Sequence, residues 1–292
     1  MRARIWGCRG SLATPGPQTV RYGGNTSCVE LRPAGGALIV LDAGTGIRPL
    51  GLALGRDRPS TIHLLLTHLH LDHVEGLGFF LPLWDPEVDL HVWGPPAPDR
   101  SLRDRIAAYL SPPLFPRPFA EIPARLHFHE VPDGDWELGS LRIVTRHVTH
   151  PGPTVAYRFE EDGRTLAFIP DNEPALDGDL RSQPEDSVSG LELARGVDVV
   201  LHDAQYTEGE YRTRVGWGHS SVADAMIFRQ LAEPGRFVMF HHEPVHSDAD
   251  LEAMLERARE LAGDAAERVV LAREGMEIDL LSAVETRPHP AG

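Results

Sequence analysis

The stretch LLLTHLHLDHVEGL, residues 64–77, decides the fold. A run of leucines typical of a buried strand precedes four metal-binding residue types, at His68, His70, Asp72 and His73. Alternate residues of an extended chain point the same way, so His68 and His70 present two imidazoles to one point. Asp72 and His73 begin a helix, and the turn carries them to the other side of the same cavity. Imidazole and carboxylate groups are the ligands that borderline divalent metals prefer, so the stretch predicts a metal site.

The rest of the chain is divided into short apolar runs that Gly and Pro separate, a pattern typical of strands. Helices are predicted over 220–231 and from Ser247 onward, where Ser247 and Asp250 have the spacing of a capping box. The strands of both halves are too apolar to face water, which favours two sheets packed face to face with helices outside. Strands are predicted over 2–6, 28–32, 37–42, 62–66, 90–93, 141–146, 154–159, 165–169, 197–201, 237–240, 269–272 and 276–280.

The run HLHLDH resembles the H-x-H-x-D-H signature of the metallo-β-lactamase superfamily, and the order of the elements resembles that family over nearly the whole chain. The resemblance implies an α/β fold, a four-layer αββα sandwich with two mixed sheets face to face. We expect a single domain over residues 1–292, with an irregular Pro-rich excursion on the surface near 95–123.

The same resemblance implies the remaining ligands. A later histidine at a strand end is expected to complete the first site, and His150 in VTHPGP suits it. A bridging acid is expected after another strand, where Asp171 stands in FIPDNE, and a last histidine at His241, with His242 as the alternative one residue on. Two divalent metals are therefore expected, zinc first, with manganese or iron as alternatives. The first would be held by His68, His70 and His150, the second by Asp72, His73 and His241, with Asp171 shared.

Two further motifs bear on the reaction. GWGHSS, residues 216–221, resembles the GHS motif of the ribonuclease Z and phosphodiesterase branch, where this histidine supports phosphodiester cleavage. His219 lies before a predicted helix, where it can reach a phosphate oxygen or a leaving group. LHDAQY, residues 201–206, resembles the segment that places an acid beside that histidine, so Asp203 would hold its tautomer. The catalytic set is thus His219, Asp203 and Asp72; the alternatives are a neighbour of a helix cap for His219 and a turn cap for Asp203.

The spacing between His150 and Asp171 bears on substrate size. Asp171 follows His150 by only 21 positions, and one predicted hairpin fills the interval, whereas ribonuclease Z carries a long tRNA-gripping arm at this place. The segments GCRGS (7–11), RYGGNTSC (21–28) and LDAGTGIR (41–48) also look like the branch that acts on small cyclic phosphodiesters. We expect hydrolysis of small phosphodiesters, cyclic nucleotides first, by water whose pKa the metals lower toward about 7. The alternatives are a lactone, thioester or β-lactam hydrolase on the same site, and a metal-binding sensor without activity.

Composition excludes other chemistry. All 28 basic residues are Arg, so a Schiff-base lysine and a P-loop lysine are absent. With 43 acidic residues the net charge is −15, which argues against a long nucleic acid as partner. No signal peptide or apolar run long enough for a membrane span is present in the 292 residues, so a cytoplasmic protein without a membrane partner is expected. The oligomeric state is left open, with a homodimer as one option.

Several weaker candidates also have ordinary structural interpretations. Asp42 is interpreted either as a partner of a ligand histidine or as a turn residue. Asn25, Thr26, Asn172 and Glu173 either line the pocket or satisfy backbone groups. His127 and His129 are interpreted as a solvated strand face, and Cys8 either as a residue near the site or as a small core residue. No role is predicted for five histidines: His63, His91, His147, His246 and His289.

Overall fold

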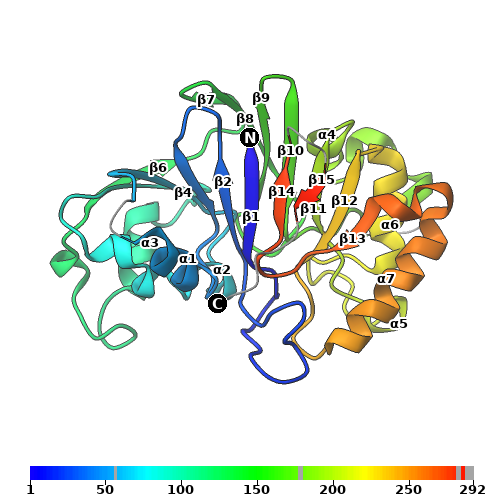
Figure 1. Cartoon of the computed structure of the whole chain (residues 1–292), viewed down its shortest axis with the longest axis horizontal. Helices are drawn as coiled ribbons and strands as arrows, with labels where there is room; N and C mark the ends of the chain where they lie inside the picture. The colour runs from blue at the N-terminus through cyan, green and yellow to red at the C-terminus, as the bar shows by residue number, and fades with distance from the viewer. Residues whose placement is uncertain (56–57, 177–179, 281–283, 287–292) are drawn as a thin grey trace.

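A computed structural model describes residues 1–55, 58–176, 180–280 and 284–286, and His289 lies outside them. Two β-sheets form its centre (Figure 1). In sheet order the first consists of β15 (Val284–Thr286), β14 (Glu277–Asp279), β1 (Arg2–Gly7), β2 (Cys28–Arg32), β3 (Leu38–Leu41), β4 (Thr61–Leu65), β5 (Asp89–Gly94) and β6 (Arg125–Glu130). The second consists of β13 (Val269–Leu271), β12 (Arg236–Phe240), β11 (Val199–Asp203), β10 (Arg164–Ile169), β9 (Val155–Glu161), β8 (Leu141–His147) and β7 (Gly134–Leu138).

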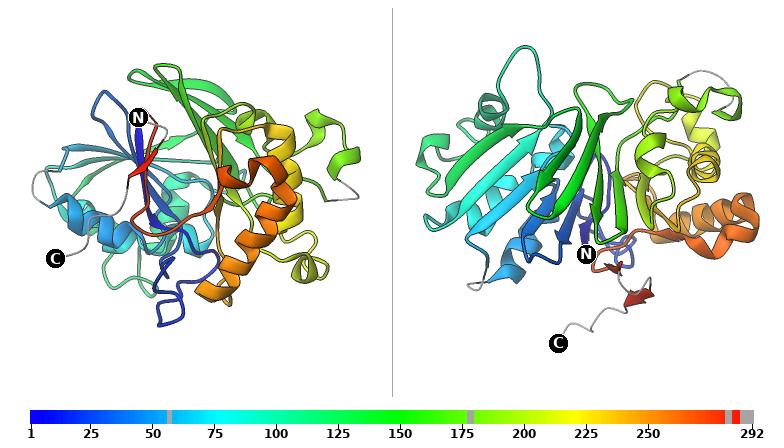
Figure 2. Two further views of the ribbon diagram at one scale, coloured as in Figure 1. Left: turned by 45° about the vertical axis from the view of Figure 1, so that its right-hand side comes forward. Right: turned by 90° about the horizontal axis from the view of Figure 1, so that it is seen from above.

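Helices cover the outer faces of both sheets. The α-helices are α1 (Ile47–Leu54), α2 (Leu71–Val74), α3 (Leu102–Tyr109), α4 (Leu191–Ala194), α5 (Glu208–Tyr211), α6 (Val222–Ala232) and α7 (Asp248–Ala262). The 3-10 helices are η1 (Leu77–Phe79), η2 (Leu81–Trp84), η3 (Phe119–Glu121), η4 (Leu180–Ser182), η5 (Glu185–Ser187) and η6 (Gly263–Arg268). Figure 1 shows α1 and α3 on one side of the sheets and α6 and α7 on the other, and Figure 2 shows the same layers from two further directions.

Three apolar cores hold these layers together. One lies between the sheets and includes Leu41 and Phe240. The second lies between the first sheet and α1, α2 and α3, and the third between the second sheet and α4, α6 and α7. The predicted αββα sandwich is therefore confirmed, since helices cover the outer face of each sheet and one apolar core lies between the sheets.

The structure differs from the sequence prediction at several elements, and some, such as α1 and β7, were not predicted. Helix α6 begins at Val222, because the Ser221 side chain accepts the hydrogen bond of the Asp224 amide as N-cap. The segment 95–123 is not irregular throughout: α3 lies within it, capped by Ser101, and buries its apolar side chains against the first sheet. The helix that begins after Ser247 is confirmed, with a full capping box.

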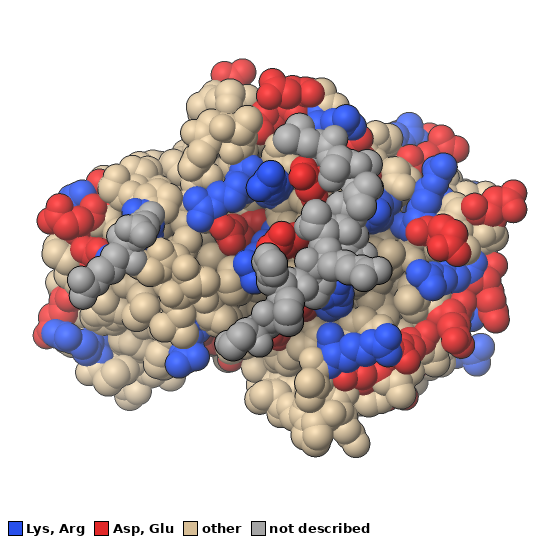
Figure 3. Space-filling view, viewed as in Figure 1, with Lys and Arg blue, Asp and Glu red and all other residues tan. Residues whose placement is uncertain are grey.

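The surface carries both charges. Within the described residues no helix combines the length and the apolar character needed to cross a membrane. On the face in Figure 3 the Arg side chains lie between Asp and Glu side chains and do not gather into one basic patch.

Candidate metal centre

The predicted ligands lie where the carboxyl ends of parallel strands from both sheets meet. β3, β4, β5 and β6 run parallel in the first sheet, and β10, β11, β12 and β13 in the second. His68 and His70 follow β4, Asp171 follows β10, and His241 follows β12 directly. His150 lies in the connection from β8 to β9. The pairing of the strands and the packing of the two sheets thus bring together side chains that are far apart in the sequence.

His68, His70 and His150 form the first group of donors, with one nitrogen of each within 4.8 Å of the others. Nδ1 of His70 lies 3.0 Å from Nε2 of His150. Nε2 of His68 is buried without a hydrogen-bond partner, an arrangement that disfavours the fold unless a ligand satisfies the nitrogen. Burial lowers the pKa of His68 and lowers the pKa of His150 to about 4. Neutral imidazoles of this kind are available as metal ligands.

Asp72, His73 and His241 form the second group of donors. Nε2 of His73 lies 3.2 Å from Oδ2 of Asp72 and 3.3 Å from Nε2 of His241. Nε2 of His241 lies 3.2 Å from the same Asp72 oxygen. His70 is the N-cap of α2, so Asp72 and His73 stand in the first turn of that helix, as the sequence predicted.

Asp171 lies between the two groups and is only 2% exposed. Its Oδ2 is 3.8 Å from Nε2 of His68 and 3.8 Å from Nε2 of His150. Its Oδ1 is 3.2 Å from Nε2 of His73, and its Oδ2 is 3.3 Å from Nε2 of His241. One carboxylate therefore faces both groups of donors.

Asp171 and the charged side chains of the second group stabilise each other's charged forms. Burial opposes the charged form of Asp171, but His241, His73 and His68 hold the pKa of this carboxyl well below its usual range. Burial also opposes the charged form of His241, but Asp171 and Asp72 raise its pKa to about 9. A cation that binds here must displace a proton from His241, so its affinity rises with pH.

Buried acceptors orient the imidazoles of this group. Nδ1 of His73 lies 2.8 Å from Oδ2 of Asp42, so Asp42 contacts a candidate ligand, the first of its two predicted alternatives. Nδ1 of His241 lies 3.1 Å from the side-chain oxygen of Gln205. An acceptor at Nδ1 fixes the tautomer in which Nε2 carries the free lone pair, which is how outer-shell groups prepare metal ligands. Gln205, two residues after Asp203, was not among the predicted site residues.

His242, the alternative last ligand, points away from the donors. Its Nε2 donates to the Ala272 carbonyl at 2.9 Å, and its ring packs edge-on against Tyr22. His241 itself has a φ of 61°, in the left-handed region, which few residues other than Gly adopt. Only Gly fits at position 10, because a Cβ there would lie 2.4 Å from the His241 ring.

His219 lies beside the donors and is paired with Asp203. Its Nδ1 is 2.7 Å from Oδ2 of Asp203, and its ring stacks on that of His241 with 5.0 Å between centroids. Asp203 also accepts the backbone N–H groups of Gln205 and Ser220, at 3.0 and 3.1 Å. The two interpretations of Asp203 are thus combined in one carboxylate, which caps the backbone and orients an imidazole. The remaining nitrogen of His219, Nε2, is the one that can donate to a substrate.

Glu173 holds the loop that carries His219. Its buried carboxylate accepts the N–H groups of Gly216 and Gly218, both at 2.8 Å, and the Tyr211 hydroxyl at 2.6 Å. The Gly218 carbonyl in turn accepts a hydrogen bond from Nδ1 of His150 at 2.9 Å. Glu173 therefore satisfies backbone groups, the second of its predicted alternatives, and through them contacts the first group of donors.

A segment before β2 closes the cluster from the other side, and its role was not predicted. The Ser11 amide donates to Oδ2 of Asp72 at 2.7 Å, from a strained backbone with a φ of 58°. The fully buried Arg9 holds this segment, because its guanidinium donates to the carbonyls of Gly23 and His246 at 2.9 and 2.8 Å.

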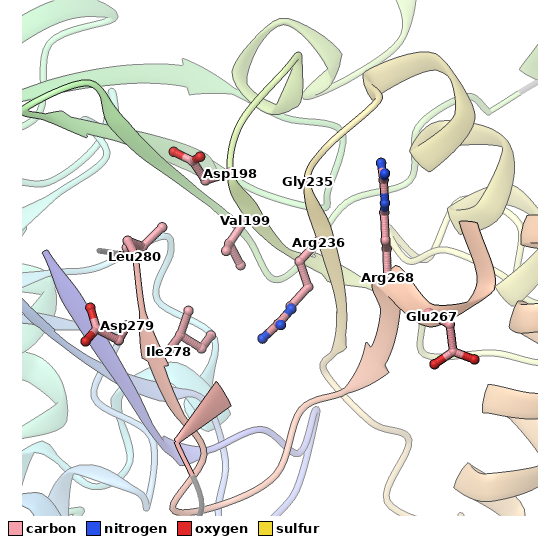
Figure 4. Close-up of a pocket in the computed structure, with 9 residues that line it drawn as sticks. All are labelled: Asp198, Val199, Gly235, Arg236, Glu267, Arg268, Ile278, Asp279 and Leu280. Atoms are coloured by element: carbon pink, nitrogen blue, oxygen red, sulfur yellow. The ribbon is translucent and has the colours of Figure 1, made fainter. Parts of the chain in front are cut away.

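The weaker candidates have partners of their own. Asn25 binds Glu274, Thr26 binds Glu75, the Asn172 side chain donates to the Ser189 carbonyl, and the Cys8 thiol lies 3.5 Å from the Tyr22 carbonyl. A pocket of about 190 Å³ lies elsewhere, where Asp198, Gly235 and Arg268 precede β11, β12 and β13 (Figure 4). Since the donors lie at the carboxyl ends of the parallel strands, this pocket at the amino ends is separate from them.

The donor set fits divalent metal ions. Imidazole nitrogens and carboxylate oxygens converge in two adjacent groups, and a buried nitrogen of His68 lacks a partner. This combination suits borderline ions such as zinc more than calcium or magnesium, which prefer oxygen ligands alone.

Comparison with known proteins agrees with this geometry. The model of the beta-lactamase superfamily domain matches residues 38–242. The chain is 27% identical over 248 residues to ribonuclease Z of Mycobacterium sp. (strain KMS), and the match covers 79% of this chain and 81% of that protein. It is 28% identical over 271 residues to ribonuclease Z of Methanopyrus kandleri, which covers 83% and 88%.

Solved structures share the fold. A diphosphatase from the PhnP family has a TM-score of 0.67 at 18% identity and covers 95% of this chain and 97% of its own. The short form of human tRNase Z has a TM-score of 0.66 at 20% identity, with coverage of 96% and 99%. Unliganded yeast PDE1 has a TM-score of 0.63 at 18% identity, with coverage of 94% and 98%. At these identities the likeness concerns the fold.

Proposed function

Because this chain belongs to the beta-lactamase superfamily, we propose that it is a metal-dependent hydrolase of small phosphodiesters, with cyclic nucleotides as the first substrate class. His68, His70 and His150 would hold one divalent ion, Asp72, His73 and His241 a second, and Asp171 would serve both. Zinc is the proposed metal. When bound, such ions lower the pKa of water and neutralise charge on a phosphate.

The contact between His219 and Asp203 carries the proposal. Hydrolysis of a phosphodiester expels an alkoxide, a poor leaving group, so a positioned acid accelerates the reaction by about 10²–10⁴-fold. Asp203 holds a proton at Nδ1 of His219, and the protonated ring can donate the proton at Nε2 to the departing oxygen. Until that proton is transferred, Asp203 stabilises the positive charge of the imidazolium, as the carboxylate of a catalytic triad does.

The segment between His150 and Asp171 supports a small substrate. It consists of β9 and β10, which pair antiparallel through a turn after Glu161, so no long arm extends from this part of the chain. The net charge of −15 and the interspersed charges in Figure 3 also oppose binding of a long polyanion. Because relatives of this chain are named ribonuclease Z, RNA is the competing substrate.

The test is a parallel assay of one zinc-loaded preparation on bis-p-nitrophenyl phosphate, cyclic nucleotides, a precursor tRNA and a panel of lactones. We expect turnover of bis-p-nitrophenyl phosphate and of cyclic nucleotides, which a chelator abolishes and added zinc restores, and no cleavage of the precursor tRNA. Hydrolysis of lactones without hydrolysis of any phosphodiester would contradict the proposal and favour an acyl hydrolase. Metal binding without turnover of any substrate would favour a sensor.

A further inference from the structure

Four histidines outside the candidate metal centre share one face of the first sheet. They stand on three neighbouring parallel strands, His63 on β4, His91 on β5, and His127 and His129 on the edge strand β6. His63 is paired with His91 across the strands, and His91 with His127. Side chains at paired positions lie on the same face of a sheet, so the register places the four rings side by side. We call them the histidine ladder.

The rings of the ladder are in contact. Nδ1 of His91 lies 3.0 Å from Nε2 of His129. The rings of His91 and His127 stack with 4.5 Å between centroids, and those of His63 and His91 lie 4.9 Å apart. Nδ1 of His63 accepts a hydrogen bond from the Trp93 indole at 3.3 Å, so the single hydrogen of this neutral ring lies on Nε2.

The surroundings keep three of these imidazoles neutral. Burial and the neighbouring histidines lower the pKa of His63 to about 4, and the same causes lower the pKa of His91 and His129. Nε2 of the fourth, His127, lies 3.0 Å from a carboxylate oxygen of Asp89. The ladder is partly exposed, so an ion can reach it from solvent.

We propose that the histidine ladder binds a divalent transition ion of the nickel, copper or zinc type, through Nδ1 of His91 and Nε2 of His129. Such ions prefer imidazole nitrogen. When both rings are neutral, one of these two nitrogens donates its hydrogen to the other. If the donor ring changes tautomer, so that its hydrogen lies on its other nitrogen, both facing nitrogens have free lone pairs and no proton is lost. Water completes the coordination. The bound ion ties the edge strand β6 to β5.

Nickel binding to the zinc-loaded full-length protein tests the proposal. We expect wild type to take up one nickel equivalent, in exchange for any zinc at the ladder, that the variant His91→Ala/His129→Ala lacks, while the chelator-sensitive activity stays the same in both. The matched control is His147→Ala, which removes an exposed histidine at the end of β8 and should bind nickel as wild type does. A double variant that keeps the extra equivalent, or a wild type that never binds it, overturns the proposal.

A local optical signal gives a second measurement. The Trp93 ring stacks on the His129 ring, with 4.0 Å between centroids. Copper at the ladder should therefore quench Trp93 emission, and the quenching should vanish in Trp93→Phe and in the single variant His129→Asn. The single variant changes one partly exposed side chain, so it serves if the double variant does not fold. Equal quenching in wild type and His129→Asn would place the copper elsewhere and contradict the proposal.

Discussion

Nδ1 of His219 lies 2.7 Å from Oδ2 of Asp203, and the same nitrogen lies 3.9 Å from Asp171. The imidazole therefore stands between an acid that only orients it and an acid that faces the metal donors. Because Asp203 occupies Nδ1, the proton that His219 can donate to a substrate is held at Nε2. The position of His219 therefore predicts that it matters more for a substrate with a poor leaving group than for one with a good leaving group.

His219→Ala should retain the metal content of wild type and lose about 10²–10⁴-fold in kcat on a cyclic nucleotide, whose leaving group is an alkoxide. Loss on bis-p-nitrophenyl phosphate should be much smaller, because nitrophenolate leaves without protonation. Steady-state kinetics on the two substrates, with metal analysis of the same samples, measures the ratio.

Asp203→Asn is the accompanying variant, and should change activity in the same direction but less, because it acts through the imidazole. Equal losses on both substrates in His219→Ala would instead make His219 a phosphate clamp. Unchanged kinetics would make it structural.

Asp171→Ala should weaken metal binding in both groups of donors, because this carboxylate faces all four of the nearest ligand imidazoles. Elemental analysis after dialysis measures the loss. His242→Ala is the matched control and should keep its metal, since His242 binds the Ala272 carbonyl instead. Full occupancy in Asp171→Ala would show that Asp171 does not bridge.

Glu173→Gln should reduce kcat on a cyclic nucleotide about tenfold or more, with a smaller change in KM. The amide keeps one acceptor oxygen but cannot accept the N–H groups of Gly216 and Gly218 with both of its terminal atoms. Hydrogen bonds to charged groups contribute about 1.5–3 kcal/mol each, so the loop that carries His219 loosens. Tyr211→Phe removes one hydrogen bond to the same carboxylate and should have the milder effect.

His202 should make the fold sensitive to acid. Burial lowers its pKa from 6.5 to about 4, so between these values the unfolded chain binds a proton that the folded chain does not. Its contribution is fully present above pH 6.5 and is lost as pH falls to 4, by about 3 kcal/mol in total. Urea unfolding of wild type and His202→Gln at pH 7, 6, 5 and 4 measures it. The variant should be less stable at pH 7, but its free energy of unfolding should fall less steeply; parallel curves would contradict the assignment.

A precursor tRNA should remain intact under conditions in which a cyclic nucleotide is consumed. The reason is the short β9–β10 hairpin between His150 and Asp171 together with the charge of −15. Gel analysis of the 3′ end gives the answer. Efficient removal of the trailer would show that another surface grips RNA.

Local patterns were enough to predict much of this molecule. The stretch from Leu64 to Leu77 predicted the end of a strand followed by a helix start, because the alternation of an extended chain and the first turn of a helix depend only on near neighbours. The helix after Ser247 and the hairpin around Glu161 were predicted for the same reason, since a capping box and a tight turn are complete within a few residues.

Other features depend on segments that only folding brings together. Helix α3 was not predicted, because prolines surround it in the sequence. Its burial against the first sheet stabilises it more than the helix propensity of its residues does. The histidine ladder was divided among three strands whose pairing no local pattern reveals. His127 and His129 were interpreted as a solvated face, yet His129 stacks on Trp93.

The sequence by itself determined which residue types could bind metal, because a histidine or an aspartate keeps its chemistry wherever it lies. Only the tertiary structure decided how each is held. Gln205 at His241, Glu173 at the loop of His219 and the Ser11 amide at Asp72 are contacts across long stretches of chain. Their hydrogen bonds form because two sheets pack face to face and bring the strand ends to one edge, and that packing is a property of the whole chain.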